Sequence, residues 1–388
     1  MPRRSRLFSL SSLARAYQRN LKAFARAAGA ASKPVRVKAV SKPRAAPRKN
    51  AVAPVPPIAR TPRAATKPVS LRGEWISGVA PGPAGARRFH AYVPTGLALR
   101  PDEKLPLLVM LHGCGQTGRD IAAVSRMNRL AARHRFVVLY PEQERVANAQ
   151  GCWNWFERRN GRAEAEAATL LAAVDKVARR LPVDLARVAV AGLSAGASMA
   201  VLMAALFPHR FCAVAMHSGV APGTAESAAT ALAAMHGRRE AHLPDLPASN
   251  AATTPALPVG ASAVLPPLLI VHGDADGVVS VRNAAATAQL WAGALGARAG
   301  AVRTLQRGQR YPMRVTEFKA RGRTVVALRE VVGLAHAWSG GAAQRPYSDP
   351  AGPDASALIW AFVARQFGKQ PRKRPQALVR IALSAIKK

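Results

Sequence analysis

Ser194 lies in the segment 192–196 (Gly-Leu-Ser-Ala-Gly), which has the G-x-S-x-G spacing of a nucleophilic serine. Apolar residues typical of a strand precede it at 188–190, and small and apolar residues at helical spacing follow it. A strand, a sharp turn and a helix in this order form a nucleophile elbow, which lifts the serine hydroxyl above the edge of a sheet. The segment therefore predicts nucleophilic catalysis by Ser194, with a plain glycine-rich turn as the alternative.

A serine hydroxyl needs a base, and an imidazole needs a carboxylate that holds it in the correct tautomer. His336 is the preferred base, because it follows the last expected strand and precedes the last expected helix. Asp274 and Asp276 both follow the expected strand at 268–271 and compete for the orienting role. Asp276 is favoured, since it lies further out, where the loop turns towards the next helix.

The oxyanion of an acyl-transfer reaction needs two backbone N–H donors. One is expected from Ala195, directly after the nucleophile, and the other from the loop 112–115, with Cys114 as the preferred donor. Aromatic side chains are expected to line an apolar substrate groove, although ordinary packing explains each of them equally well. These residues are Trp153, Trp155 and Trp338.

The elements that must position these residues alternate between strands and helices. Strands are expected at 74–79, 87–93, 105–111, 136–140, 188–190, 211–216, 268–271, 302–306, 312–319 and 324–331. Helices are expected at 119–133, 162–180, directly after Ser194, 225–236, 282–295 and 354–367. Such alternation predicts an α/β fold, in which helices cover both faces of a mostly parallel sheet and ligands gather at the carboxyl ends of the strands.

Charge and composition divide the 388-residue chain into three parts. Residues 1–72 and 368–388 together hold 25 of the 57 basic residues and none of the 20 acidic ones. We expect a disordered basic extension at 1–70 with an amphipathic helix at 7–29, a catalytic domain at 71–367 and a basic tail at 368–388. The segment 221–263, which lacks strong periodicity, is expected to be a lid-like insert in the catalytic domain.

The three cysteines do not form a disulfide framework or a zinc pattern. Cys114 and Cys152 lie in loops that could meet near the active site, so a single bridge and two free thiols both remain open. The Asp-x-Asp-Gly at 274–277 resembles part of a calcium loop, but the other ligands are missing, so no metal is expected. No apolar run is long enough for a transmembrane helix, and the N-terminus lacks the compact apolar region of a secretion signal.

Five motifs together resemble the esterase family of polyhydroxybutyrate depolymerases, whose relatives include feruloyl and acetylxylan esterases. They are His112–Thr117, Cys152–Phe156, Gly192–Gly196, His272–Asp276 and Gly333–Trp338. The resemblance covers residues 71–367 and implies an α/β-hydrolase fold, ester hydrolysis through an acyl-enzyme, and no metal or other cofactor. It supports Ser194 as nucleophile, Asp276 as orienter, His336 as base and Cys114 as oxyanion donor. Ala197 departs from the pattern, because the family often has a further glycine there.

The sequence therefore predicts a serine ester hydrolase that acts on polyhydroxyalkanoate-type or related esters. A feruloyl- or acetylxylan-type polysaccharide esterase is the alternative substrate class. A surface-binding protein is the alternative of another kind, whose basic ends dock on a polymer granule, an anionic membrane or nucleic acid, without a specific nucleic-acid site. The resemblance implies an extracellular location, and a cytoplasmic, granule-associated enzyme is the alternative.

Overall fold

The computed structural model describes residues 73–100, 102–244 and 264–368. The predicted extension at 1–70 with its helix, and the predicted tail after Gly368, lie outside the described residues. So do residues 245–263 of the predicted insert. Within the described part of the chain, no helix is both long enough and apolar enough to cross a membrane.

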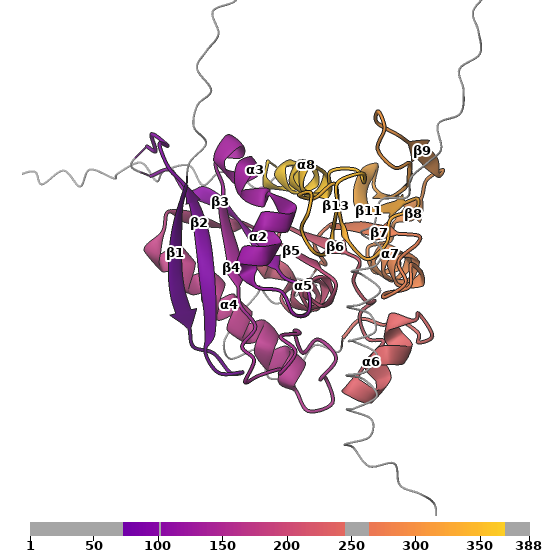
Figure 1. The fold of residues 1–388 in the computed structure, drawn as a ribbon, viewed down its shortest axis with the longest axis horizontal. Helices are drawn as coiled ribbons and strands as arrows, with labels where there is room; N and C mark the ends of the chain where they lie inside the picture. Colours follow the sequence, from indigo (N-terminus) through magenta and orange to yellow (C-terminus); the bar gives the residue numbers. More distant parts are fainter. Residues whose placement is uncertain (1–72, 101, 245–263, 369–388) are drawn as a thin grey trace, which may run out of the picture. The chain divides into compact units, whose positions relative to one another are not determined.

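An eleven-stranded mixed sheet forms the centre of the fold, in the order β1-β2-β4-β3-β5-β6-β7-β11-β10-β8, with β9 also paired to β10 (Figure 1). The strands are β1 Gly73–Ala80, β2 Arg87–Pro94, β3 Leu105–Leu111, β4 Val137–Pro141, β5 Val183–Leu193, β6 Ala213–His217, β7 Leu268–Gly273, β8 Arg298–Ala299, β9 Arg303–Leu305, β10 Met313–Ala320 and β11 Arg323–Val331. The pairs from β4 through β11 along this order are parallel, whereas β1, β2, β8, β9 and β10 pair antiparallel. The predicted, mostly parallel α/β sheet is confirmed.

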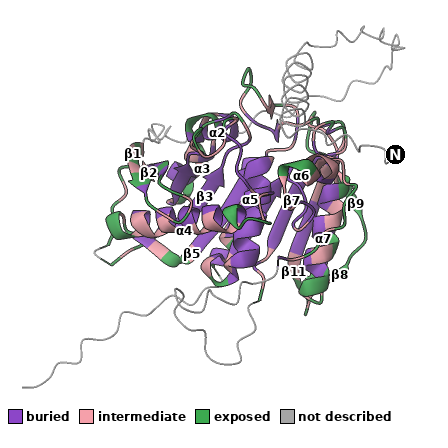
Figure 2. Ribbon diagram, turned by 90° about the horizontal axis from the view of Figure 1, so that it is seen from below, coloured by how far each residue is buried: buried purple, intermediate pink, exposed green. Residues whose placement is uncertain are grey.

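Helices cover both faces of the sheet, and each face has its own hydrophobic core. Helices α4, α5 and α7 contribute to one core, and α2, α3 and α8 contribute to the other. Figure 2 shows the buried central strands with α4, α5 and α7 on the side nearest the viewer. The helices are α2 Gly118–Ser125, α3 Met127–His134, α4 Arg162–Arg180, α5 Ala195–Leu206, α6 Ala228–Met235, α7 Arg282–Ala294 and α8 Ala355–Phe367. All seven residues of β3 are buried, because both faces of this strand are covered.

Three local features differ from the expected elements. The single helix expected at 119–133 is divided at Arg126, whose left-handed backbone (φ 55°) ends α2 and begins α3. Strand β5 begins at Val183, five residues before the apolar stretch that predicted it. The sequence did not predict this first half, because most of its residues are not buried and therefore need not be apolar. The short strands β12 Trp338–Ser339 and β13 Ser348–Asp349 pair in a separate two-stranded sheet after β11.

Candidate functional site

The turn that carries Ser194 lies between β5 and α5. Ser194 has φ 56° and ψ −121°, a backbone conformation that non-glycine residues rarely adopt. Its N–H donates to the carbonyl oxygen of His217 at 2.9 Å, and its own carbonyl accepts from the N–H of Ser198 at 3.0 Å. Because both neighbouring elements hold the turn, the strained conformation is kept, as a nucleophile elbow requires.

Glycines on both sides of Ser194 allow this turn to pack closely. A Cβ added at Gly192 would lie 2.3 Å from the carbonyl carbon of Gly196, and one at Gly196 would lie 2.3 Å from the carbonyl oxygen of Leu111. Neither contact is possible for a real side chain, and both involve backbone atoms that cannot move aside cheaply. The G-x-S-x-G spacing therefore has a steric cause in this structure.

Asp276 and His336 are brought together from the ends of two adjacent parallel strands, β7 and β11. The Nδ1–H of His336 donates to Oδ2 of Asp276 at 2.8 Å. The other carboxylate oxygen, Oδ1, accepts from the N–H groups of Val278 and Val279, each at 2.9 Å. The carboxylate is thus fixed by backbone donors on one side, and the ring nitrogen Nε2 of His336 is left as the proton acceptor.

Electrostatics keep Asp276 ionised. Burial alone would raise the pKa of this carboxyl, but the charge of His336 and hydrogen bonds from His272 and His336 hold the pKa well below its usual range. His272 Nε2 lies 2.8 Å from the carbonyl oxygen of Val279 and 3.4 Å from Oδ2 of Asp276. An orienting group that remains anionic can stabilise an imidazolium on His336.

Asp274, the competing carboxylate, has a different environment. Its Oδ1 accepts from the N–H of Gly333 at 2.7 Å, and its Oδ2 lies 3.2 Å from Nη2 of Arg314. Gly333 begins the loop that carries His336 and has a positive φ of 76°. Asp274 therefore holds the histidine loop in place, while Asp276 contacts the histidine itself.

His217 connects the serine turn to the histidine loop, a role that the sequence analysis missed. Its carbonyl oxygen accepts from the N–H of Ser194, and its ring Nε2 accepts from the N–H of Ser339 at 3.1 Å. The ring also stacks on Trp338 at 4.9 Å between centroids.

Among the described residues, no hydrogen bond joins Oγ of Ser194 to Nε2 of His336. A contact of this kind tightens when substrate enters.

The loop 112–116 lies directly against Ser194, since a Cβ added at Gly113 would be 3.6 Å from the Cβ of Ser194. Most N–H groups of this loop are occupied. Gly113 donates to Oε1 of Gln116 at 2.9 Å, Gly115 donates to the carbonyl of Gln150 at 3.0 Å, and Gln116 donates to the carbonyl of Gly113 at 3.2 Å. Within the described residues, no partner is recorded for the N–H of Cys114 or for that of Ala195 at the start of α5. These two donors thus remain available for an oxyanion.

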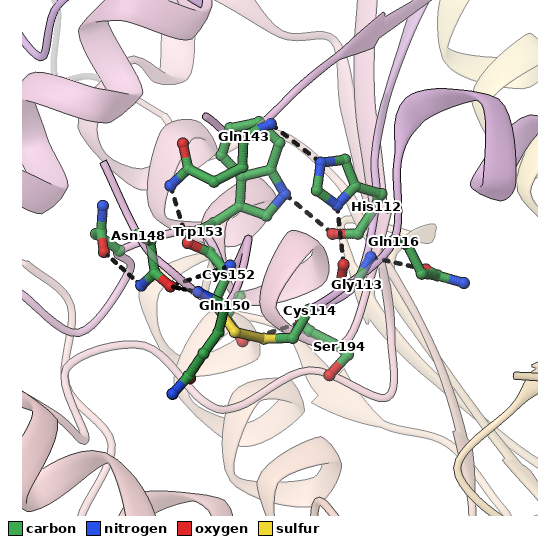
Figure 3. Close-up of a disulfide and its surroundings, with 12 residues drawn as sticks. His112, Gly113, Cys114, Gln116, Gln143, Asn148, Gln150, Cys152, Trp153 and Ser194 are labelled. Atoms are coloured by element: carbon green, nitrogen blue, oxygen red, sulfur yellow. Dashed lines mark hydrogen bonds between the residues drawn. A yellow bond between two sulfur atoms is a disulfide. The ribbon is translucent and has the colours of Figure 1, made fainter. Parts of the chain in front are cut away.

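A disulfide joins Cys114 to Cys152, so the bridge that the sequence left open is present in the structure. Figure 3 shows it beside Ser194, between the loop 112–116 and the loop 148–154. The latter loop is tied down by Gln143, whose Nε2 donates to the carbonyl of Cys152 at 2.8 Å and also contacts Glu166. The oxyanion loop is therefore cross-linked to a second, hydrogen-bonded loop.

Glu166 and Arg87 form a buried ion pair beneath this second loop, at 2.8 Å between Oε1 and Nη2. Oε2 of Glu166 also accepts from the N–H of Asn154 at 2.6 Å. Buried charges are retained when they are paired and hydrogen-bonded in this way. Sequence reasoning missed both residues, because Arg87 and Glu166 are 79 positions apart and neither stands in a motif.

Two of the three tryptophans expected in a substrate groove are completely buried. Trp153 donates its indole N–H to the carbonyl of His112 at 2.9 Å, and Trp338 donates its own to Oγ of Ser356 at 3.1 Å. The expectation is corrected for these two, which support the loops around the site because they have no surface open to a substrate. Trp155 is only partly buried and packs edge-on against Phe156.

Comparison with known proteins agrees with this geometry. Residues 88–305, more than half of the chain, match the family model described as Esterase PHB depolymerase. The chain belongs to this family. The family model is that of an esterase, and the resemblance inferred from the five motifs is confirmed.

Relatives in this family have different substrates in their names. Poly(3-hydroxyalkanoate) depolymerase C of Paucimonas lemoignei is 37% identical over 145 residues, which is 37% of this chain and 34% of the relative. Probable acetylxylan esterase A of Aspergillus clavatus is 30% identical over 227 residues, which is 56% of this chain and 70% of the relative. The chain thus spans about a third of the first relative's length.

A solved structure supports the fold. The acetyl xylan esterase from Aspergillus awamori aligns with a TM-score of 0.54 at 22% identity, covering 68% of this chain and 94% of that chain. The predicted α/β-hydrolase fold is confirmed.

The Cys114–Cys152 disulfide is consistent with an extracellular location, because such bridges persist in oxidising compartments.

Opening the disulfide is expected to slow ester hydrolysis. In Cys152→Ala, the N–H of Cys114 loses its cross-linked support, so kcat should fall about 10-fold or more while KM changes less. The free energy of unfolding should also fall by about 3 kcal/mol. Steady-state kinetics with and without dithiothreitol measure this: reductant should slow the wild type and leave Cys152→Ala unchanged. Full activity in a wild-type sample whose thiols titrate as reduced would contradict the expected coupling.

Buried histidines should make stability depend on pH. Burial lowers the pKa of His112 to about 4 and that of His217 to about 3. Between those values and about 6.5, the unfolded chain binds protons that the folded chain does not, so stability falls as the pH falls. We expect a loss of about 2 kcal/mol per histidine between pH 7 and pH 5, measured by urea unfolding. His217→Gln keeps an acceptor for the N–H of Ser339 and should reduce the total loss of stability between pH 7 and pH 5 by about half. An unchanged loss would exclude His217 as a cause.

Proposed function

We propose that this enzyme hydrolyses polyhydroxyalkanoate-type esters through an acyl-enzyme on Ser194. The observation that carries the proposal is the 2.8 Å hydrogen bond between His336 Nδ1 and Asp276 Oδ2. His217 contacts both the strained turn of Ser194 and Ser339, three residues after His336. In this arrangement, Nε2 of His336 is the free lone pair of the ring. The three groups supply a nucleophile, a base and an orienting anion.

In the first half of the reaction, Ser194 Oγ attacks the ester carbonyl and its proton passes to His336 Nε2. The negative charge that develops on the carbonyl oxygen accepts hydrogen bonds from the N–H groups of Ala195 and Cys114. Asp276 stabilises the imidazolium on His336. The tetrahedral intermediate collapses when His336 returns the proton to the leaving alcohol, which leaves the acyl group on Ser194.

In the second half, His336 takes a proton from water, which attacks the acyl-enzyme. The same two N–H donors stabilise the second tetrahedral intermediate. Its collapse breaks the bond between the acyl carbon and Ser194 Oγ as His336 returns the proton to Oγ, which releases the carboxylic acid and restores the serine. Trp155 is the aromatic residue proposed to contact the acyl chain, since it is the partly exposed member of the three tryptophans. The disulfide supports the further proposal that the enzyme works outside the cell.

A comparison of substrates tests the proposed specificity. The 37% identity to a poly(3-hydroxyalkanoate) depolymerase favours hydroxyalkanoate esters, and the 30% identity to an acetylxylan esterase favours the alternative. We expect faster clearing of amorphous polyhydroxybutyrate than release of acetate from acetylated xylan or of ferulate from feruloyl esters, each referred to p-nitrophenyl butyrate hydrolysis. A preference for acetylated xylan would assign the enzyme to the polysaccharide esterases instead.

A further inference from the structure

A second serine–histidine–carboxylate arrangement lies on the antiparallel edge of the sheet. Ser77 in β1 is directly opposite His90 in β2, and its Oγ lies 2.7 Å from Nδ1 of His90. The other ring nitrogen, Nε2, lies 3.5 Å from Oε1 of Glu142, which follows β4. Two of the residues thus lie in neighbouring strands, and the third directly follows the next strand of the sheet.

Backbone pairing and side-chain contacts hold this group together. The N–H of Glu142 donates to the carbonyl of Arg88 at 2.8 Å, and Oε1 of Glu142 accepts from the N–H of Gly118 at 2.9 Å. The ring of His90 packs edge-on against Trp75 at 6.2 Å between centroids. The guanidinium of Arg119 lies 3.7 Å above the Trp75 ring. His90 is therefore restrained on both sides, while Ser77 is exposed to solvent.

The contacts define how protons are shared. A carboxylate facing Nε2 favours the tautomer with the proton on Nε2, which leaves Nδ1 as the acceptor for the Ser77 hydroxyl. Burial and the nearby charges of Arg119 and Arg88 lower the pKa of His90, so the ring is neutral near neutral pH and its Nδ1 lone pair is available to the Ser77 hydroxyl. Serine activation requires a hydroxyl within hydrogen-bond reach of such a base.

We propose that Ser77 is a second nucleophile, which accepts an acyl group from activated carboxylic esters. Ser77 Oγ attacks the carbonyl carbon of p-nitrophenyl acetate, and its proton passes to His90 Nδ1. The new Oγ–C bond forms as the bond to p-nitrophenolate breaks, and p-nitrophenolate leaves with the electron pair. The imidazolium, with its Nε2–H facing Glu142, then releases the proton to water.

The product is a stable acetyl-serine rather than an intermediate that turns over. Ser194 lies at the start of helix α5, where free N–H groups can bind an oxyanion. Ser77 lies inside a strand and has no helix start beneath it. The site therefore serves as an acyl-acceptor site on the enzyme surface, separate from the ester-hydrolysing site.

Full-length Ser194→Ala treated with p-nitrophenyl acetate tests this, with peptide mass spectrometry as the readout. Ser280 is the internal reference, because it is partly exposed and its Oγ accepts a 3.3 Å hydrogen bond from the backbone N–H of Arg282. We expect acetyl-Ser77 to form about 100-fold faster than acetyl-Ser280. This difference should be lost in Ser194→Ala/His90→Gln and reduced in Ser194→Ala/Glu142→Gln, whose amide oxygen can still accept from Gly118.

Acetylation of Ser77 no faster than that of Ser280 would overturn the proposal, and so would a rate unaffected by His90→Gln. Equal thermal unfolding midpoints of the variants confirm that they fold alike. The result is independent of the proposed function. Sustained p-nitrophenol release by Ser194→Ala would count against Ser194 as the catalytic nucleophile. The Ser77 proposal is tested by a different readout, the incorporation of one acetyl group per chain at Ser77.

Discussion

Ser194→Ala is expected to lose ester hydrolysis by about 10³- to 10⁶-fold in kcat, measured with p-nitrophenyl butyrate. Without Oγ no acyl-enzyme can form, and His336 and Asp276 have no nucleophile to activate. The oxyanion donors remain, so a small residual rate over the uncatalysed reaction should persist. Substrate binding should change little, because the binding surface is left intact.

The stability of Ser194→Ala is the control for this experiment. No side-chain hydrogen bond caps α5 at Ser194, and alanine has the same Cβ at the same positive φ. The free energy of unfolding should therefore stay within about 0.5 kcal/mol of the wild type. A folded variant that retains more than a tenth of the wild-type rate would exclude Ser194 as the nucleophile.

The sheet and the serine turn could be predicted from the sequence because local rules determine them. A fully apolar run such as 105–111 suits a strand that is covered on both faces, and it is one. The glycines at 192 and 196 are required by contacts within a few residues of Ser194 and with the adjacent strand end. Where a local signal was absent, the prediction was wrong: no glycine or proline marks the helix break at Arg126, whose left-handed backbone only the structure reveals.

Contacts between distant segments explain what the sequence could not provide. His217 accepts from the N–H of Ser339, which lies 122 positions later, and the Arg87–Glu166 pair contacts the loop at Asn154. His217, Arg87 and Glu166 do not stand in a recognisable motif. The burial of Trp153 and Trp338 is equally non-local, because an aromatic residue beside a catalytic motif can either face the substrate or support the loop.

Asp276→Asn is expected to lower kcat by about 10²- to 10⁴-fold. In the wild type, Oδ1 accepts two backbone N–H groups, from Val278 and Val279. In the variant the amide oxygen must keep that position, because an amide NH₂ there would face two donors. The NH₂ group then points to Nδ1 of His336, which must become an acceptor. The ring proton moves to Nε2, and the base that Ser194 needs is lost.

Asp274→Asn is the matched control, since the two aspartates are two positions apart. Asp274 contacts the loop that carries His336, whereas Asp276 contacts His336 itself. Asp274 contacts Gly333 and Arg314 rather than His336, so its variant should lose less than about 10-fold in kcat and about 1 kcal/mol of stability. NMR of the His336 ring nitrogens should report a proton on Nε2 in Asp276→Asn and on Nδ1 in Asp274→Asn. If the larger kinetic loss and the tautomer change followed Asp274→Asn instead, Asp274 would be the orienting residue, since the tautomer of the base distinguishes direct orientation from loop support.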